Sequence, residues 1–221
     1  MKIKKILYTI KQRLKRYFKR LFSGPFYKSS NKYWVQKIPI KNIEERLSFL
    51  IDYCHNKDVL HIGCTDWPIF NPANNLHIEL AKHTKILHGF DVDVEGIELL
   101  KNYVNQSYFS DFDDLYDQNY DVCLVPETIE HVDNVKDFLV NISKIKASKF
   151  IFTTPNCFAP GIHKRNYRGK DFFIELVHPD HNCWFSPYTL KNQIEKYSSL
   201  KVLNIFLIEN GKTICCEAIK D

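Results

Sequence analysis

The most informative feature of this sequence is a pair of short apolar segments. Each of them ends in a residue that can help to bind a nucleoside. The first, over residues 58–63, ends in Gly63, and the second, over residues 85–91, ends in Asp91. Glycine lets the backbone approach a ligand closely, and a carboxylate at the end of the next strand can accept hydrogen bonds from ribose hydroxyls. The two segments therefore predict a nucleotide-like cofactor and, with it, an enzyme.

Three histidines later in the chain could act as a general base toward a substrate hydroxyl. His131 comes just before an expected helix, and His178 and His181 follow a loop over residues 157–175 that is rich in aromatic and basic residues. Histidine titrates near neutral pH, as proton transfer of this kind requires. His131 is the first candidate and His178 and His181 are the second, while a structural role for His131, in which its ring fixes the loop, fits the sequence equally well.

Two of these histidines also have part of the spacing of a zinc site, His178-x-x-His181-x-Cys183. A closed zinc site has four ligands, and Cys157 is the only obvious further donor nearby. Because the ligand set is incomplete, we expect no metal ion at this position.

The elements that would position these residues alternate between strands and helices. Such alternation implies a mainly parallel sheet covered by helices, which is an α/β fold. The sequence Glu-Asn-Gly over residues 209–211 is a hairpin signal, so the last two strands should be antiparallel to each other. We expect strands over residues 58–63, 85–91, 120–125, 148–154, 201–208 and 212–219, and helices over residues 43–53, 73–83, 94–104, 132–145 and 187–197.

Six motifs in order resemble those of the class I S-adenosylmethionine-dependent methyltransferases, over roughly residues 45–220. The chain is most similar to the branch that acts on small molecules and glycans. The resemblance implies a Rossmann-like, seven-stranded, mostly parallel sheet with an antiparallel C-terminal strand and helices on both faces, and S-adenosyl-L-methionine as the cofactor. The motifs are Val59–Cys64, Gly89–Asp91, Phe109–Phe112, Tyr120–Glu127 with Ile129–Val132, Phe150–Asn156 and His178–Leu190.

The resemblance also implies roles for single residues. Asp91 would bind the ribose, Asp111 would accept a hydrogen bond from the adenine amine, and Phe112 would stack nearby. Each acid has a structural alternative, because Asp91 could cap the next helix and Asp111 could be a solvated loop charge. The full set of expected cofactor-binding residues is Gly63, Cys64, Asp66, Asp91, Asp93, Asp111, Phe112 and Glu127.

The sequence departs from the family pattern in the loop after the first strand. The family has an acid where this chain has His61, and further glycines where it has Thr65 and Trp67. Glycine permits a positive φ and a close approach to the cofactor, so this loop should have a different shape. Asp66 could replace the missing acid. Alternatively, the protein keeps the fold as a scaffold and no longer methylates. A nicotinamide-dependent oxidoreductase is disfavoured, because the sequence has no Gly-x-Gly-x-x-Gly motif.

Positive charge is concentrated at the N-terminus. Residues 1–22 hold nine of the 31 Lys and Arg residues and no acid, which leaves 22 bases against 26 acids in the remainder. A nucleic-acid partner is therefore not expected, because a binding domain should carry its own basic face. A basic amphipathic helix of this kind can lie on an anionic membrane surface, or it can be solvated. We expect this helix over residues 1–23, a linker over 24–43 and a methyltransferase-like domain over 44–221.

The remaining composition favours a cytoplasmic protein, peripheral to the membrane if the basic helix binds there. The seven cysteines are scattered and odd in number, which indicates reduced thiols. No run of about 18 apolar residues is present, so no transmembrane segment is expected.

We expect methyl transfer to a small polar or glycan-type acceptor, by analogy in bacterial surface-polysaccharide modification. The sequence leaves the acceptor atom and the oligomeric state open.

Overall fold

The computed structural model describes Leu14 and residues 36–221, without residues 67–69, 160, 162–166, 169 and 176–177. The basic helix expected at the N-terminus therefore lies outside the described residues, except for Leu14, and so does Trp67. The chain divides into two compact units, Met1–Lys37 and Ile38–Asp221. The helices and strands named below all belong to the second unit.

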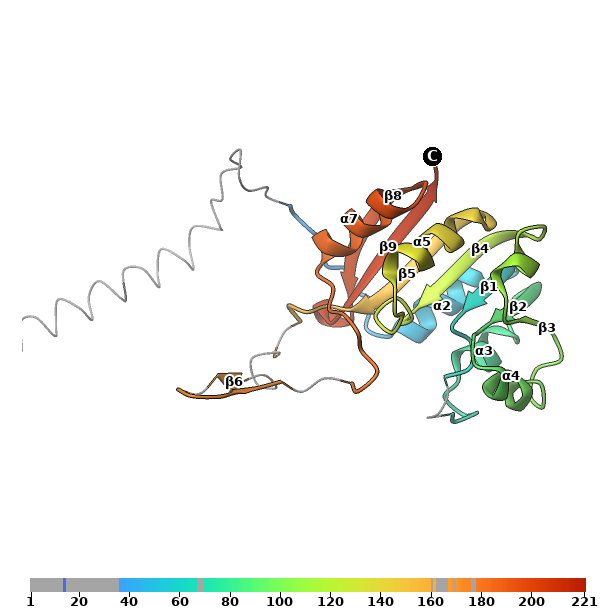
Figure 1. Ribbon diagram of the computed structural model, residues 1–221, viewed down its shortest axis with the longest axis horizontal. Coiled ribbons are helices and arrows are strands. Elements are labelled where there is room, and N and C mark those ends of the chain that lie inside the picture. Colours follow the sequence, from blue (N-terminus) through green and yellow to red (C-terminus); the bar gives the residue numbers. More distant parts are fainter. Residues whose placement is uncertain are drawn as a thin grey trace, which may run out of the picture. The chain divides into compact units, whose positions relative to one another are not determined.

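A seven-stranded sheet forms the centre of this unit (Figure 1). The strands lie in the order β3-β2-β1-β4-β5-β9-β8, and β9 runs antiparallel to both of its neighbours while the other neighbouring pairs are parallel. This arrangement confirms the predicted Rossmann-like sheet with an antiparallel C-terminal strand. The strands are β1 (Asp58–Ile62), β2 (Ile86–Phe90), β3 (Ser107–Phe109), β4 (Asn119–Pro126), β5 (Lys146–Pro155), β8 (Leu200–Ile208) and β9 (Thr213–Lys220).

Helices cover both faces of the sheet, because successive residues of a buried strand point to opposite sides. Phe152 of β5 belongs to an apolar cluster with Ile142 and Ile194, from α5 and α7. Its neighbour Ile151 belongs to a second cluster with Leu50, from α2. Both faces are therefore buried, as the sequence predicted. The helices are α2 (Arg46–Cys54), α3 (Leu76–Leu80), α4 (Val94–Leu100), α5 (Val135–Lys144) and α7 (Pro187–Tyr197).

Capping residues explain where several helices begin. The predicted start of α7 is confirmed, since Ser186 forms a capping box with Thr189 and Pro187 occupies the first turn. By contrast, α5 begins later than expected, because the side chain of Asn134 accepts hydrogen bonds from two backbone amides of its first turn. In the same way, Asn75 caps α3 and sets its start.

Two segments outside the main sheet have structure that the sequence did not predict. Within the loop over residues 157–175, β6 (Tyr167–Arg168) pairs with β7 (Phe173–Ile174) in a small antiparallel sheet. The end of the expected linker is irregular, as predicted, but it is hydrogen-bonded to β8 through Lys41 N and Leu207 O, 2.9 Å apart. Among the described residues, no helix is long and apolar enough to cross a membrane.

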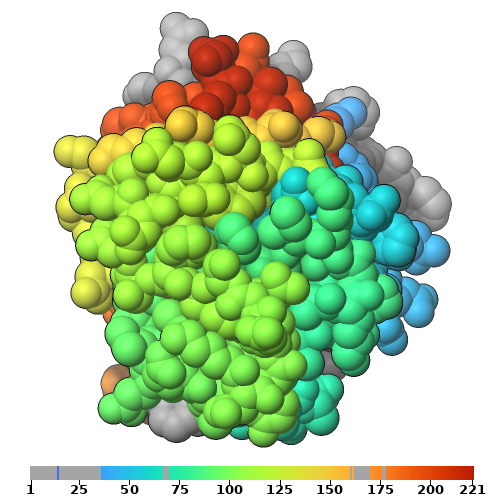
Figure 2. Space-filling model, turned by 90° about the vertical axis from the view of Figure 1, so that its right-hand side faces the viewer, coloured from blue at the N-terminus to red at the C-terminus, as the bar shows by residue number. Residues whose placement is uncertain are grey.

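The carboxyl ends of β1, β2 and β4 meet at one edge of the sheet. Ile62 pairs with Phe90, and His61 pairs with Leu124, so the loops that follow these strands lie together. The strand order reverses between β1 and β4, which is the position where open α/β sheets bind ligands. Figure 2 shows the face of the molecule made mostly by the green segments that carry β2, β3 and β4.

Candidate functional site

A cleft of about 940 Å³ lies at this edge of the sheet. Its lining comes from the loops after β1, β2 and β4, from the starts of α2 and α3, from one side of α5 and from the segment that precedes α7. A cleft of this size is within the range of small-molecule sites. It therefore offers the chain a single place in which the predicted cofactor-binding residues and the histidines can meet.

Gly63 is required in the loop after β1 for two reasons. Its φ is +75°, and a Cβ on it would lie 2.4 Å from Thr128 Oγ1. The Thr128 hydroxyl in turn donates to Pro126 O at 2.8 Å and lies 3.2 Å from Ile62 O, so it joins the loops after β1 and β4. The expected close approach at Gly63 is therefore made by Thr128.

The loop reaches a second left-handed conformation at Asp66, whose φ is +59°. The family pattern places glycines at the positions of Thr65 and Trp67 instead. Aspartate tolerates this conformation better than most residues, so the turn forms without those glycines. Thr65 can then keep an ordinary backbone and bury its side chain.

Asp91 holds this loop against the end of β2. Its Oδ2 accepts hydrogen bonds from Thr65 N at 3.1 Å and from Thr65 Oγ1 at 3.0 Å, and its Oδ1 accepts one from Asp93 N at 3.1 Å. A carboxylate has about four acceptor positions, so one remains for a ligand. Asp91 does not cap the next helix, because Asp93 is the N-cap of α4.

The two residues expected at the adenine differ in their placement. Phe112 lines the cleft and packs its ring against Phe90, with the ring centroids 4.2 Å apart. Asp111 is exposed, is the N-cap of the short helix η1 (Phe112–Leu115) and accepts a hydrogen bond from Asp113 N at 3.0 Å. It is not among the residues that line the cleft.

Charged groups gather where β4 ends. Glu127 has a φ of 45°, and its Oε1 lies 3.2 Å from Arg46 Nη1. Burial raises the pKa of Glu127, and the Arg46 guanidinium opposes that shift. Glu130 is buried and accepts a hydrogen bond from Thr154 Oγ1 at 2.9 Å, and burial together with the charge of Glu127 raises its pKa to about 8. Arg46 was not predicted as a site residue, because it lies in α2, which is far along the chain from the motif at the end of β4.

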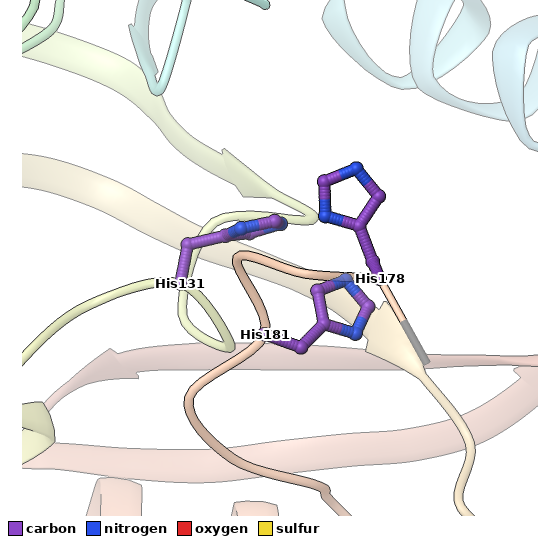
Figure 3. Close-up of side chains that lie close together, drawn as sticks. All are labelled: His131, His178 and His181. Carbon is purple, nitrogen blue, oxygen red and sulfur yellow. The ribbon is translucent and has the colours of Figure 1, made fainter. Parts of the chain in front are cut away.

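Two hydrogen bonds donated by Asn182 hold together the two segments that carry the three histidines. Asn182 donates from its backbone amide to Glu130 O at 2.8 Å and from its side chain to His131 O at 2.7 Å. These bonds join the loop after β4 to the segment before α7, and the rings of His131, His178 and His181 face a common space (Figure 3). The ring centroids are 4.7–5.6 Å apart.

Burial favours the uncharged form of two of these rings. Burial lowers the pKa of His131 and of His181, and a positive charge on a neighbouring histidine would lower each further. A neutral imidazole can accept a proton or bind a metal ion. The cluster is therefore chemically competent for either role.

His61 and Cys64 have structural surroundings. His61 is buried and stacks on His77, with their Nδ1 atoms 3.2 Å apart, and burial lowers the pKa of both rings. His61 is therefore a core histidine that packs against another imidazole. Cys64 is buried as well, and burial raises the pKa of its thiol far above neutral, so it is not a nucleophile.

No protein-family model and no curated protein sequence matches this chain. Solved structures do match it. A SAM-dependent methyltransferase from Aquifex aeolicus has a TM-score of 0.57 at 12% identity, over 80% of this chain and 90% of its own. DhpI in complex with SAH has a TM-score of 0.53 at 15% identity, over 79% and 81%. Magnesium protoporphyrin IX methyltransferase from Synechocystis PCC 6803, with bound SAH, has a TM-score of 0.53 at 13% identity, over 79% and 82%.

The fold is that of the class I S-adenosylmethionine-dependent methyltransferases. In this methyltransferase fold, the cleft brings together nearly all the residues that the sequence singled out. The predicted residues that line the cleft are Gly63, Cys64, Asp66, Asp91, Asp93, Phe112, Glu127, His131, His178 and His181.

Proposed function

We propose that this chain transfers a methyl group from S-adenosylmethionine to a small polar or glycan-type acceptor. The observation that carries the proposal is the cleft at the reversal of strand order, which Gly63 and Asp91 line at the ends of β1 and β2. Open α/β sheets bind nucleotides at this position. The methyltransferase fold supports the same reading.

The residues of the cleft fit such a cofactor. Asp91 keeps one acceptor position, and that position suits a ribose hydroxyl. Phe112 offers an aromatic ring at the cleft for the adenine. S-adenosylmethionine, when bound, supplies a methyl group on a positively charged sulfonium. Asp91 and Phe112 would then fix its orientation, and orientation contributes much of the rate in an in-line displacement.

The histidines occupy the part of the cleft suited to the acceptor. Burial lowers the pKa of His131 and of His181, which favours the neutral imidazole that could take the proton of an acceptor hydroxyl. Such a base contributes roughly 10²–10⁴-fold when it is well placed. A polar acceptor also fits the many charged side chains in the lining, Arg46, Glu127 and Asp180 among them. The basic N-terminal segment supports a location at an anionic membrane surface, where lipid-linked or nucleotide-linked sugars could be reached.

A scaffold that keeps the fold without methylating is the second candidate. Two observations favour it: Thr128 occupies the space next to Gly63, and Thr65 takes two of the acceptor positions of Asp91. If these contacts are permanent, the cofactor cannot reach the loop after β1.

Titration calorimetry of the full chain with S-adenosylmethionine separates the two candidates. We expect saturable binding with a Kd between about 1 μM and 1 mM, the usual range for enzyme substrates. Asp91→Asn should weaken binding about 10-fold or more, since a hydrogen bond to a charged group is lost. Asp114→Asn, at an exposed carboxylate outside the cleft, is the matched control and should bind normally. Folded protein that gives neither heat nor a thermal shift would refute the enzyme proposal.

A further inference from the structure

We propose that His131, His178 and His181 form a binding site for a divalent transition-metal ion, with zinc as the type case and one coordination position open to the cleft. Each ring offers a nitrogen, and these three nitrogens all lie within 4.8 Å of one another. All three side chains are half-buried and line the cleft. They come from two segments that the Asn182 hydrogen bonds hold together (Figure 3).

The spacing suits a site with three protein ligands. Nitrogens bound tetrahedrally to zinc at about 2.1 Å lie roughly 3.4 Å from one another. Side-chain rotations that move each ring nitrogen by about 1 Å would therefore complete the geometry. Three protein ligands and one open position are the arrangement of catalytic zinc sites, whereas structural sites are closed by four. Imidazole also binds copper, nickel and iron, so the donor set defines a class of ions.

The hydrogen bonding around the cluster points to a missing partner. His181 Nδ1 is buried and has no hydrogen-bond partner among the described residues. Buried polar atoms are nearly always paired, so a further group is expected close to this ring. His178 Nδ1 accepts a hydrogen bond from Asp180 N at 3.3 Å, and Asp180 Oδ2 lies 3.8 Å from the same nitrogen. The Asp180 carboxylate therefore places a negative charge beside the cluster, which favours a bound cation.

The ligand set differs from the zinc spacing that the sequence suggested. Cys183 Sγ lies 3.8 Å from Ile129 O and 3.9 Å from Glu130 O, as a weak donor to backbone carbonyls. The third donor is instead His131, which the fold brings to His178 and His181. The proposal therefore replaces the earlier expectation that this position holds no metal.

The open position gives the ion a role in methyl transfer, and this part rests on the proposed function. An acceptor hydroxyl bound to the ion would have a lower pKa and a fixed direction. In this case the histidines bind the ion and do not act as the base, so the proton would leave to a carboxylate of the cleft such as Asp180, or to water. The oxygen would attack the methyl carbon, and the carbon–sulfur bond would break with both electrons going to sulfur. The ion changes no oxidation state, and the products are the methyl ether, the neutral thioether and a proton.

The test is metal binding by the full chain, after chelation and removal of the chelator. Calorimetry with Zn²⁺ should give one ion per chain, and Co²⁺ should give visible absorption typical of nitrogen ligands. His181→Gln and, separately, His178→Gln should weaken binding more than about 100-fold. Asp180→Asn should weaken binding less than either histidine variant, because it removes a negative charge beside the cluster and no ligand. His55→Gln, at an exposed histidine outside the cluster, should bind as the natural chain does.

The outcomes separate the proposals. Loss of binding in both histidine variants, with unchanged circular dichroism and melting temperature, supports the site. Binding that survives in either histidine variant overturns it. So does binding that is lost in Cys183→Ser, or a cobalt complex with a near-ultraviolet thiolate band. If the natural chain shows no saturable binding of Zn²⁺, the metal proposal is also overturned, and the histidines are left with a role in proton transfer. S-adenosylmethionine binding by the metal-free protein is measured separately, so that failure of the cofactor proposal does not count against the metal site.

Discussion

The two sides of the cleft differ in how their polar groups are satisfied. On the cofactor side, which comprises Gly63, Thr65, Asp91 and Asp93, the residues bond mostly to one another through short loops. On the histidine side, which comprises His131, His178 and His181, three rings face each other and His181 Nδ1 has no partner among the described residues. The cofactor side is therefore held mainly by its own hydrogen bonds, although Asp93 Oδ2 is also buried without a partner among the described residues, whereas the histidine side brings three imidazole rings together.

Gly63→Ala should have the largest effect. The new methyl group would meet Thr128 Oγ1 at 2.4 Å, at a φ of +75°. We expect a loss of about 3 kcal/mol in the free energy of unfolding, from the clash and the strained backbone together. Urea denaturation measures it. Gly161→Ala is the matched control, because its φ is +83° and its Cβ would have no neighbour within 4 Å. If both variants lose the same stability, Thr128 does not lock the cofactor side.

Acidification should lower the stability of the folded chain through the buried pair formed by His61 of β1 and His77 of α3. Burial lowers both pKa values in the folded chain, that of His77 from 6.5 to about 3. Between these values the unfolded chain binds more protons, so stability is complete above pH 6.5 and falls below it. Each ring contributes a slope of at most about 1.4 kcal/mol per pH unit, or about 2 kcal/mol between pH 6.5 and 5.

His77→Gln should reduce this slope by the contribution of one ring. Urea midpoints measured from pH 7 to 5 provide the readout, and the difference between the two chains removes the background from carboxylates. His55→Gln, at an exposed ring, should keep the slope of the natural chain. An unchanged slope in His77→Gln would mean that the pair is already protonated or accessible in the folded state.

Thr65→Val should tighten S-adenosylmethionine binding several-fold, by about 1 kcal/mol. The Thr65 hydroxyl occupies an acceptor position on Asp91, and its removal frees that position for a ribose hydroxyl. Calorimetry measures the change. Thr84→Val, which loses a hydroxyl bonded to Leu80 O in α3, is the distant control. Weaker binding in Thr65→Val would show that the hydroxyl supports the cofactor site and does not compete with the ribose.

Asn182→Ala should have the smallest effect on stability and should act on the histidine side. It removes the side-chain bond to His131 O at 2.7 Å, while the backbone bond to Glu130 O remains. We expect at most about 1 kcal/mol of lost stability and weaker Zn²⁺ binding. Asn102→Ala removes comparable bonds at the end of α4 and should leave metal binding unchanged. Full metal affinity in Asn182→Ala would mean that this bond does not position the rings.

The contrast also explains what the sequence could predict. Hydrophobic periodicity and turn signals were enough to predict the sheet, because each strand and helix is specified by residues that are close together in the sequence. The cofactor side is local in the same sense, since Asp91 and Asp93 follow directly from β2. Gly63 was predicted for a different reason from the one observed, because the contact with Thr128 depends on β4 lying beside β1.

The histidine side could be predicted only in part. Each histidine was a candidate, but the rings meet because Asn182 bonds to Glu130 and His131, and no periodic pattern encodes such a contact. Arg46 reaches Glu127 from α2 for a similar reason. Residues brought together by irregular segments therefore remain outside what a single sequence predicts.

A crystal structure of the full chain at a saturating concentration of S-adenosylhomocysteine tests the central claim most directly. We predict the ligand in the cleft, with a ribose hydroxyl within hydrogen-bond distance of the Asp91 carboxylate and its adenine beside Phe112. Thr65 Oγ1 should have turned away from Asp91, if both ribose hydroxyls are bound. A cleft without ligand, with Thr65 still bonded to Asp91 and Thr128 still against Gly63, would contradict the account.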